Sequence, residues 1–216
     1  MKKVVAFTGA GISVASGLPT FDFTWRGIPA RDLLTIESFL ADPERFYLFF
    51  REALARWQAA TPNPAHRALA AAEIPVITQN IDGLHQRAGS RVVVELHGNL
   101  RHMVCLGCGH REPLVLPPTG LPLCRCGRVL KPDVVLFGEE LHGWEEAIAL
   151  LEGVEHLLVI GTSLTVAPAC YIPGYAAASG ATVEIINEAA ATKVPEAVAR
   201  LRREGAIAPA RSALRS

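Results

Sequence analysis

Five short runs of apolar, mostly β-branched residues recur along this chain, and longer Ala- and Leu-rich stretches separate them. The runs span residues 4–7, 75–77, 92–94, 156–160 and 182–186. Polar residues do not alternate within these runs, which is typical of parallel strands buried on both faces. The intervening segments 41–60, 65–73, 143–152, 168–179 and 194–203 are predicted helices. Strand alternating with helix predicts a doubly wound parallel α/β sheet.

Composition bounds the classes of protein to which this chain can belong. Half of its 216 residues are hydrophobic and 19% are charged, which excludes a disordered chain and fits one or two domains. Lys and Arg number 21, as do Asp and Glu, so the formal charge of zero excludes a generally basic nucleic-acid binder and an acidic tail. The apolar run near Met1 is too short for a signal peptide, and no stretch of about 18 apolar residues occurs. We expect a cytoplasmic protein without membrane contact or direct nucleic-acid binding.

Two stretches do not fit the alternating pattern and are expected to form a smaller, inserted domain. Residues 23–72 have a helical pattern with many aromatic side chains, whereas residues 99–132 hold cysteines and prolines. Residues 1–22, 73–98 and 133–216 remain for the larger, Rossmann-like domain. The fold prediction is therefore one large α/β domain and one small domain made of a helical module and a cysteine-rich module.

Polar residues and glycines directly follow each predicted strand. In an open parallel sheet the carboxyl ends of the strands share one edge, and ligands bind there. Five such clusters at one edge predict a ligand site more strongly than any one of them does alone. The clusters are residues 8–13, 78–82, 95–98, 161–163 and 187–188.

The first cluster contains Gly9-Ala10-Gly11, the start of a dinucleotide-binding fingerprint. Glycines allow a sharp turn and let a phosphate approach the amides at a helix start. Val14 stands where a third glycine is usual, so close packing of the turn is an alternative interpretation. Together with the second small-residue turn at 161–163, the motif favours a dinucleotide over a mononucleotide.

Among the seven histidines, His97 is the candidate general base. It follows a predicted buried strand and precedes Gly98, a position that exposes its ring at the ligand edge. A neutral imidazole there is able to take a proton from a sugar hydroxyl near neutral pH. His66 and His85 fall in predicted helices, and we interpret both as structural.

Four of the five cysteines form the pairs Cys105-x-x-Cys108 and Cys124-x-Cys126. In a reducing compartment four clustered thiolates predict a closed, tetrahedral Zn²⁺ site with a structural role. Four unrelated buried thiols are the alternative, and the single residue within the second pair tightens its chelate loop. Basic residues surround the cluster, and we interpret them as a solvated rim in preference to a nucleic-acid contact. They are Arg101, Arg111, Arg125, Arg128 and Lys131.

The order of these motifs resembles the sirtuins, the NAD-dependent protein deacylases. The resemblance covers nearly the whole chain and, in the absence of long terminal extensions, is greatest to the compact prokaryotic members. The motifs are GAGIS at 9–13, SGLPTF at 16–21, TQNIDGLH at 78–85, ELHG at 95–98, the four cysteines, VVLFGE at 134–139, GTSL at 161–164 and INE at 186–188.

The resemblance implies a role for each matching residue. His97 is the implied general base on a ribose hydroxyl of NAD, with Asn80 and Asp82 orienting the nicotinamide and its ribose. The residues implied to contact NAD are Gly9, Ala10, Gly11, Ile12, Ser13, Pro19, Phe21, Gln79, Asn80, Ile81, Asp82, Gly161, Thr162, Ser163, Asn187 and Glu188. Those implied to contact the substrate peptide are Tyr47, Val135, Leu136, Phe137, Gly138, Glu139 and Val166. The segment 135–139 is implied to pair with the peptide as an added strand.

The implied reaction transfers the acyl group of an acylated lysine to ADP-ribose. The acyl oxygen attacks the anomeric carbon of the nicotinamide ribose, nicotinamide leaves, and an alkylimidate forms. His97 then helps a ribose hydroxyl to capture the acyl carbon, and O-acyl-ADP-ribose and free lysine are released. NAD is thus the implied co-substrate, acylated lysine in proteins or peptides the implied partner, and one Zn²⁺ the implied structural metal.

Two departures from the family pattern bear on the site. Asp22 follows Pro-Thr-Phe where the family usually has Arg, so either Arg26 substitutes or NAD binding differs. The subgroup that removes succinyl and malonyl groups carries Tyr-x-x-Arg, whereas here Phe50 stands three residues after Tyr47. Arg51 lies about 100° further around a helix. We therefore expect acetyl or apolar acyl groups to be preferred.

Three other functions stay open at this level. A nicotinamide oxidoreductase with a structural zinc would use the same cofactor for hydride transfer. An inactive reader of acyl-lysine would bind peptides without turnover, and mono-ADP-ribosyl transfer is the third. The order of the motifs favours the deacylase.

Overall fold

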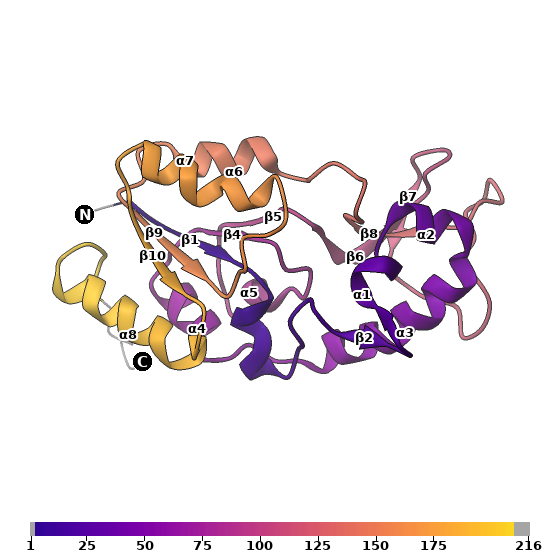
Figure 1. The fold of residues 1–216 in the computed structure, drawn as a ribbon, viewed down its shortest axis with the longest axis horizontal. Coiled ribbons are helices and arrows are strands. Elements are labelled where there is room, and N and C mark those ends of the chain that lie inside the picture. Colours follow the sequence, from indigo (N-terminus) through magenta and orange to yellow (C-terminus); the bar gives the residue numbers. More distant parts are fainter. Residues whose placement is uncertain (1–2, 210–216) are drawn as a thin grey trace, which may run out of the picture.

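The structure is a computed structural model that describes residues 3–209, and a parallel five-stranded sheet forms its centre (Figure 1). The strands are β1 (Val4–Thr8), β4 (Val76–Thr78), β5 (Val93–Glu95), β9 (His156–Ile160) and β10 (Thr182–Ile186). Their order is β10-β9-β1-β4-β5, and every neighbouring pair is parallel. All five apolar runs contribute to this sheet, so the predicted doubly wound fold is confirmed.

Helices cover both faces of the sheet. Helices α6 (Trp144–Leu151) and α7 (Ile172–Ala178) lie on one face, whereas α4 (Pro64–Ala71) and α8 (Ala190–Arg203) lie on the other (Figure 1). These helices correspond to four of the predicted helical segments. The layers therefore follow from the alternation of strands and helices along the chain.

The position of β1 between two helical layers explains why residues 4–7 are all apolar. Val4 and Ala6 pack in the core that includes residues of α4 and α8, whereas Val5 and Phe7 pack in the core that includes residues of α6 and α7. All four side chains are at most 5% exposed. Because both faces are covered, an apolar side chain at every position of this strand is removed from water.

Helix α8 begins at Ala190, one turn before the expected start at Val194. The amide of Lys193 donates to the carbonyl of Ala189 at 2.9 Å, so a hydrogen-bonded turn precedes Pro195. Proline lacks an N–H and is favoured in the first turn of a helix, which is why the pattern points to a start near it.

The remaining larger elements gather at one end of the molecule (Figure 1). They are α1 (Ala30–Leu33), α2 (Ile36–Ala41), α3 (Pro43–Ala59) and the hairpin of β2 (Thr24–Trp25) and β3 (Ile28–Pro29). An aromatic cluster forms their core, and Phe46, Tyr47 and Phe50 in it are each at most 2% exposed. The centroids of these three rings lie between 5.5 and 6.0 Å apart, within the favourable range for aromatic pairs.

A three-stranded antiparallel sheet completes this end. It consists of β6 (Gly98–Val104), β7 (Arg111–Pro113) and β8 (Lys131–Val134), in the order β7-β6-β8. Val134 and Leu136 pack with the aromatic cluster, although the sequence-based division assigns both to the larger domain. The bounds 23–72 and 99–132 thus stay a prediction for the smaller domain, and β8 runs across the expected boundary.

Three short helical turns complete the described elements. They are η1 (Ala10–Ser16), α5 (Leu84–Arg87) and η2 (Ala169–Tyr171). The helix expected over 168–179 therefore begins as the separate turn η2 before α7. Within residues 3–209, no helix combines the length and the apolar character needed to cross a bilayer.

Candidate active site

The loops that follow the strands meet at one edge of the sheet. The amide of Gly9 donates to the carbonyl of Ile160, and the amide of Gln79 donates to that of Thr8, both at 2.9 Å. The amide of Gly161 donates to the last residue of β10 at the same distance. These bonds tie the ends of β1, β4, β9 and β10 to one another, as the parallel sheet predicts.

Two glycine loops pack backbone against backbone at this edge. The Gly11 N–H donates to the Gly161 carbonyl at 2.8 Å. A Cβ on Gly11 would lie 2.6 Å from the Gly161 Cα, and a Cβ on Gly161 would lie 2.7 Å from the Gly11 Cα. Gly161 also has φ of 61°, which favours glycine. The packing interpretation of these glycines therefore applies, and their contact with a nucleotide stays a prediction.

Ser13, Asn80 and Asp82 form one hydrogen-bonded network beside these loops. The Ser13 hydroxyl donates to Asp82 Oδ2 at 2.7 Å, and Asn80 Nδ2 donates to the Gly9 carbonyl at 3.1 Å and to Ser13 Oγ at 3.3 Å. The Leu84 amide donates to Asp82 Oδ1 at 2.9 Å. Burial raises the pKa of Asp82, whereas the hydrogen bonds from the Leu84 amide and the Ser13 hydroxyl oppose the shift. The network brings together three of the residues expected to contact a nucleotide.

His97 lies in the turn that follows β5, and its ring is fixed at one nitrogen. Nδ1 lies 2.8 Å from the backbone carbonyl of Gln79. A carbonyl only accepts, so this contact assigns the proton to Nδ1 and leaves the lone pair on Nε2. Burial lowers the pKa of His97, while the bond to Gln79 opposes the shift. His97 is therefore a neutral imidazole with a basic Nε2 near neutral pH.

The loops after β9 and β10 are joined through Thr162. Its hydroxyl donates to Gln79 Oε1 at 2.8 Å, and its amide donates to Asn187 Oδ1 at 3.1 Å. Ser163 and Glu188 are exposed next to these groups. Thr162 thus links the ends of β4, β9 and β10 through Gln79 and Asn187, contacts for which the sequence alone offered no signal.

The segment from Val135 to Glu139 connects His97 to the helices α1 and α2 through backbone hydrogen bonds. The Val135 N–H donates to the His97 carbonyl at 2.8 Å. Phe137 exchanges hydrogen bonds of 2.9 and 3.0 Å with the amide and carbonyl groups of the chain at Leu34 and Ile36. Among the described residues, the Val135 carbonyl and the Gly138 amide have no hydrogen-bond partner. Two backbone groups of this segment are thus available to an incoming chain.

Phe21 contacts this segment through Phe137, whereas the flanking position expected for Val166 stays a prediction. The ring of Phe21 is 44% exposed and meets the ring of Phe137 edge-on, with centroids 5.7 Å apart. Val166 is half-buried in the loop before η2. Ile81 is also half-buried, and Ile12 and Pro19 lie in or after η1. The contacts of these side chains with ligands stay predictions.

Tyr47, which is expected to contact the substrate peptide, is buried in this structure, and that contact stays a prediction. Its ring is 2% exposed within the aromatic cluster, and its hydroxyl donates to the Leu130 carbonyl. Burial raises the pKa of Tyr47. Phe50 is fully buried as well, and the guanidinium of Arg51 donates to the carbonyls of Pro117 and Gly120 at 2.6 and 2.8 Å. In this structure Tyr47 and Phe50 are core residues because the helix face they occupy packs against the small sheet.

Asp22 and Arg26 both lie outside the network around His97. Asp22 is exposed, and a hydrogen bond from the Thr20 hydroxyl lowers its pKa. Arg26 donates to Glu52 at 2.9 Å, and its guanidinium lies 4.5 Å from the centre of the Trp25 ring. Arg26 is therefore engaged elsewhere and does not stand in for the family arginine in this conformation.

The four clustered cysteines fit a structural metal. Their sulfur atoms all lie within 4.8 Å of one another, and the pairs Cys105–Cys126 and Cys108–Cys124 are each 3.5 Å apart. Zinc–sulfur bonds of about 2.3 Å place the sulfurs of a tetrahedral site at similar separations. The amides of Cys108 and Gly107 stabilise the thiolate of Cys105 and lower its pKa to about 6. The single-residue spacing of the second pair is thus compatible with the site.

Four of the five basic residues around the cysteines are exposed, as a solvated rim predicts, whereas Lys131 is buried. Lys131 is 3% exposed and pairs with Glu139 at 2.9 Å. Arg101 and Arg111 bind Glu95 and Asp133. The expectation is therefore wrong for Lys131, because a charged side chain that looks exposed in sequence here satisfies all its donors internally.

Sequence reasoning also missed Asn63, which holds the loop of η1 in place. Its Nδ2 donates to the Ile12 carbonyl at 2.7 Å and to Ser16 Oγ at 3.0 Å, while its Oδ1 caps α4. Asn followed by Pro64 marks a helix start, but nothing local in the sequence indicates the contact with Ile12.

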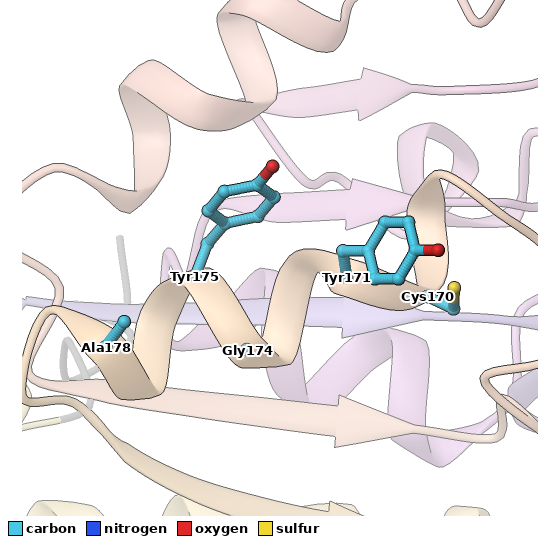
Figure 2. A pocket seen from close by; sticks show the side chains of 5 residues that line it. All are labelled: Cys170, Tyr171, Gly174, Tyr175 and Ala178. Carbon is cyan, nitrogen blue, oxygen red and sulfur yellow. The ribbon is translucent and has the colours of Figure 1, made fainter.

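A hollow of about 410 Å³ lies elsewhere, on the surface of η2 and α7. Figure 2 shows the rings of Tyr171 and Tyr175 projecting from this segment, with the sulfur of Cys170 beside Tyr171. None of the predicted site residues lines it. The candidate site is therefore defined by the strand-end network and not by this hollow.

Comparisons with known proteins agree with this geometry. Residues 9–168 match the model of the Sir2 family. An NAD-dependent protein deacylase of Thermococcus kodakarensis is 44% identical over 202 residues, which cover 85% of this chain and 79% of the relative. A Sir2 homologue variant solved with 2′-O-acetyl-ADP-ribose has a TM-score of 0.86 at 33% identity, over 93% of this chain and 92% of that one. A Sir2 complex with a p53 peptide and NAD⁺ has a TM-score of 0.81 at 36% identity, over 94% and 92%. The chain belongs to the Sir2 family, the sirtuins.

Proposed function

We propose that this protein is an NAD-dependent protein-lysine deacylase that favours acetyl groups and transfers them to ADP-ribose with release of nicotinamide. One observation carries the proposal: His97 joins both halves of the site. Its Nε2 is a free base at the edge where the strand-end network lies, and its backbone carbonyl accepts the N–H of Val135, the first residue of the segment with open backbone groups. A base and a peptide edge are thus held by one residue.

The residues around His97 suit a nicotinamide dinucleotide. When bound, NAD supplies an electrophilic anomeric carbon and the ribose hydroxyl that receives the acyl group. We assign to His97 the acceptance of the proton of that hydroxyl at Nε2. We assign to Asn80 and Asp82, both part of the network with Ser13, the orientation of the polar groups of the nicotinamide and its ribose.

The acyl-lysine substrate is assigned to the segment Val135–Glu139. Its free carbonyl at Val135 and free amide at Gly138 support addition of an extended peptide, a mode in which backbone hydrogen bonds supply affinity. Val166 is assigned to the opposite flank. The metal is assigned a structural role only, because four thiolates leave no open coordination position for water.

The residues near Tyr47 support a preference for acetyl and apolar acyl groups. Phe50 stands where an acidic acyl group would need an arginine, and the guanidinium of Arg51 is bound to two carbonyls of the loop 117–120. An acidic acyl group would therefore lose its charge partner. Comparable rates on succinylated and acetylated versions of one peptide would contradict this preference.

The partners we propose are acylated lysines in cytoplasmic proteins. The zero formal charge and the pairing of Lys131, Arg101 and Arg111 with Glu139, Glu95 and Asp133 support the absence of direct nucleic-acid contact.

Mass spectrometry of an acetyl-lysine peptide incubated with NAD tests the proposal. The wild-type chain is expected to release nicotinamide, deacetylated peptide and O-acetyl-ADP-ribose, whereas His97→Ala is expected to lose the acetyl-transfer product. His110→Ala is the matched control, since His110 lies beyond the network and contacts Glu112. Formation of NADH, followed by its absorbance, would favour an oxidoreductase instead, and peptide binding without turnover would favour a reader. Unchanged product formation by His97→Ala would remove His97 from its proposed role.

A further inference from the structure

An ion pair joins the buried Lys131 of β8 to the half-buried Glu139, the last residue of the segment Val135–Glu139. The Lys131 side chain is 4% exposed, and its ammonium donates to Glu139 Oε2 at 2.9 Å, to the Val134 carbonyl at 2.6 Å and to the Pro132 carbonyl at 3.3 Å. An ammonium has three donors, and all three are used here. A buried ion pair contributes little net stability compared with apolar side chains, so its value to the protein is sought in what it positions.

Glu139 uses the same carboxylate to hold the backbone of Leu136. Its Oε2 accepts the Leu136 N–H at 2.8 Å, and its own amide donates to the Leu136 carbonyl at 3.0 Å. Residues 136–139 form a closed turn. Gly138 occupies its third position with φ of 93°, a conformation that favours glycine. Both backbone groups of Leu136 are therefore engaged within the turn.

The bond to Leu136 also fixes the direction of the Val135 carbonyl. The Leu136 N–H and the Val135 C=O belong to one peptide unit, which is planar and trans, so the two groups point in opposite directions. Glu139 holds the N–H inward, and the free carbonyl of Val135 must then point outward. The preceding peptide unit is held at both ends, by Lys131 at the Val134 carbonyl and by His97 at the Val135 N–H.

We propose that Lys131 and Glu139 are positioning residues that orient the Val135 carbonyl toward the substrate backbone. The inference rests on the proposed function, because it assigns this segment to the substrate peptide. A hydrogen bond from an amide to a carboxylate also polarises the carbonyl of the same peptide unit, which makes that carbonyl a better acceptor. The pair thus sets both the direction and the strength of one substrate contact.

Neutral variants separate this role from a merely structural one. Loss of one partner leaves the other charge buried and unpaired, so Glu139→Gln and Lys131→Met are each expected to lower stability. The double variant Lys131→Met/Glu139→Gln removes both charges, and it is expected to fold with its metal retained. A structural role predicts that the double variant recovers peptide binding. The positioning role predicts that it does not, because methionine cannot hold the Val134 carbonyl.

The experiment measures anisotropy of a fluorescein-labelled acetyl-lysine peptide, with ADP-ribose binding measured in parallel. The double variant is expected to bind the peptide about tenfold more weakly, which is about 1.4 kcal/mol, and ADP-ribose within about twofold of wild type. Hydrogen exchange of the Leu136 amide is expected to be faster than in the wild-type chain. Glu184→Gln is the matched control, since Glu184 is a comparably exposed carboxylate (29% against 22%) paired with Arg200 outside the site.

Two results would overturn the inference. One is a folded double variant that binds the peptide within about twofold of wild type. The other is unchanged exchange at Leu136. Failure of the wild-type chain itself to bind the acetylated peptide would instead overturn the proposed function, so the two failures are distinguishable.

Discussion

Acidification is expected to destabilise this protein because two imidazoles are buried against each other. The rings of His66 in α4 and His85 in α5 have centroids 4.8 Å apart. Within the described residues, His66 Nε2 and His85 Nδ1 have no hydrogen-bond partner. Burial lowers the pKa of His66 to about 4 and that of His85 to about 3. Both rings are therefore neutral in the folded protein at neutral pH.

The sign of the effect follows from the two states. An unfolded histidine titrates near pH 6.5, so below that value the unfolded chain binds protons that the folded chain excludes. The free energy of unfolding is then complete above about pH 6.5 and falls as the pH drops toward the folded pKa values. Each group costs about 1.4 kcal/mol per pH unit, so His66 alone removes about 3 kcal/mol by pH 4. That is a large share of the free energy of unfolding of a typical domain, which is about 5–15 kcal/mol.

The variant His66→Gln removes this titration while keeping the helix start. His66 occupies the third helical position of a capping box with Asn63, and glutamine is favourable at that position. Urea unfolding between pH 7.5 and 4.5 is expected to show a pH slope reduced by about 1.4 kcal/mol per unit. His110→Gln, outside the pair, is the matched control variant. A wild-type slope in His66→Gln would refute the reasoning.

Three further predictions concern the site and its supports. Because burial lowers the pKa of His97, peptide deacylation is expected to persist below pH 6.5, and a rate–pH profile with a higher midpoint would contradict this. Gly161→Ala is expected to lower the free energy of unfolding by more than about 1–2 kcal/mol, because of backbone strain and the clash with Gly11. Gly174 has open space around it, so Gly174→Ala is expected to change the free energy of unfolding little or to raise it. Urea unfolding measures both variants. Cys126→Ser is expected to abolish the equivalent of zinc found in the wild type by elemental analysis and to lower Tm, and unchanged zinc content would disprove the ligand assignment.

The sequence determined which segments form the sheet but not their neighbours within it. Uninterrupted apolar runs such as Val4–Phe7 are characteristic of strands covered on both faces, and the structure agrees. Strand order depends on pairing between distant segments, and a run of valines does not indicate which other run it will pair with. The start of α8 was misplaced for a related reason, because Pro195 is a strong local signal and the turn before it has none.

At the candidate site, the sequence predicted where along the fold the functional residues lie better than it predicted which groups their side chains contact. His97, Asn80 and Asp82 were expected at the strand ends, and the structure places them there. Lys131 was misjudged because lysine is rarely buried, and only the distant Glu139 and the backbone of β8 make burial possible. The burial of Tyr47 against the small sheet was not foreseen, because a motif does not tell which face of a helix meets that sheet.

The central place of β1 constrains how the chain folds during synthesis. One side of β1 pairs with β4, but its other side pairs only with β9, which begins at His156. Until that later segment leaves the ribosome, an apolar strand keeps an unpaired edge that can template association with other chains. A nascent chain stalled before His156–Ile160 has left the ribosome is therefore expected to aggregate or to recruit chaperones, whereas one stalled after β9 has emerged can close the middle of its sheet.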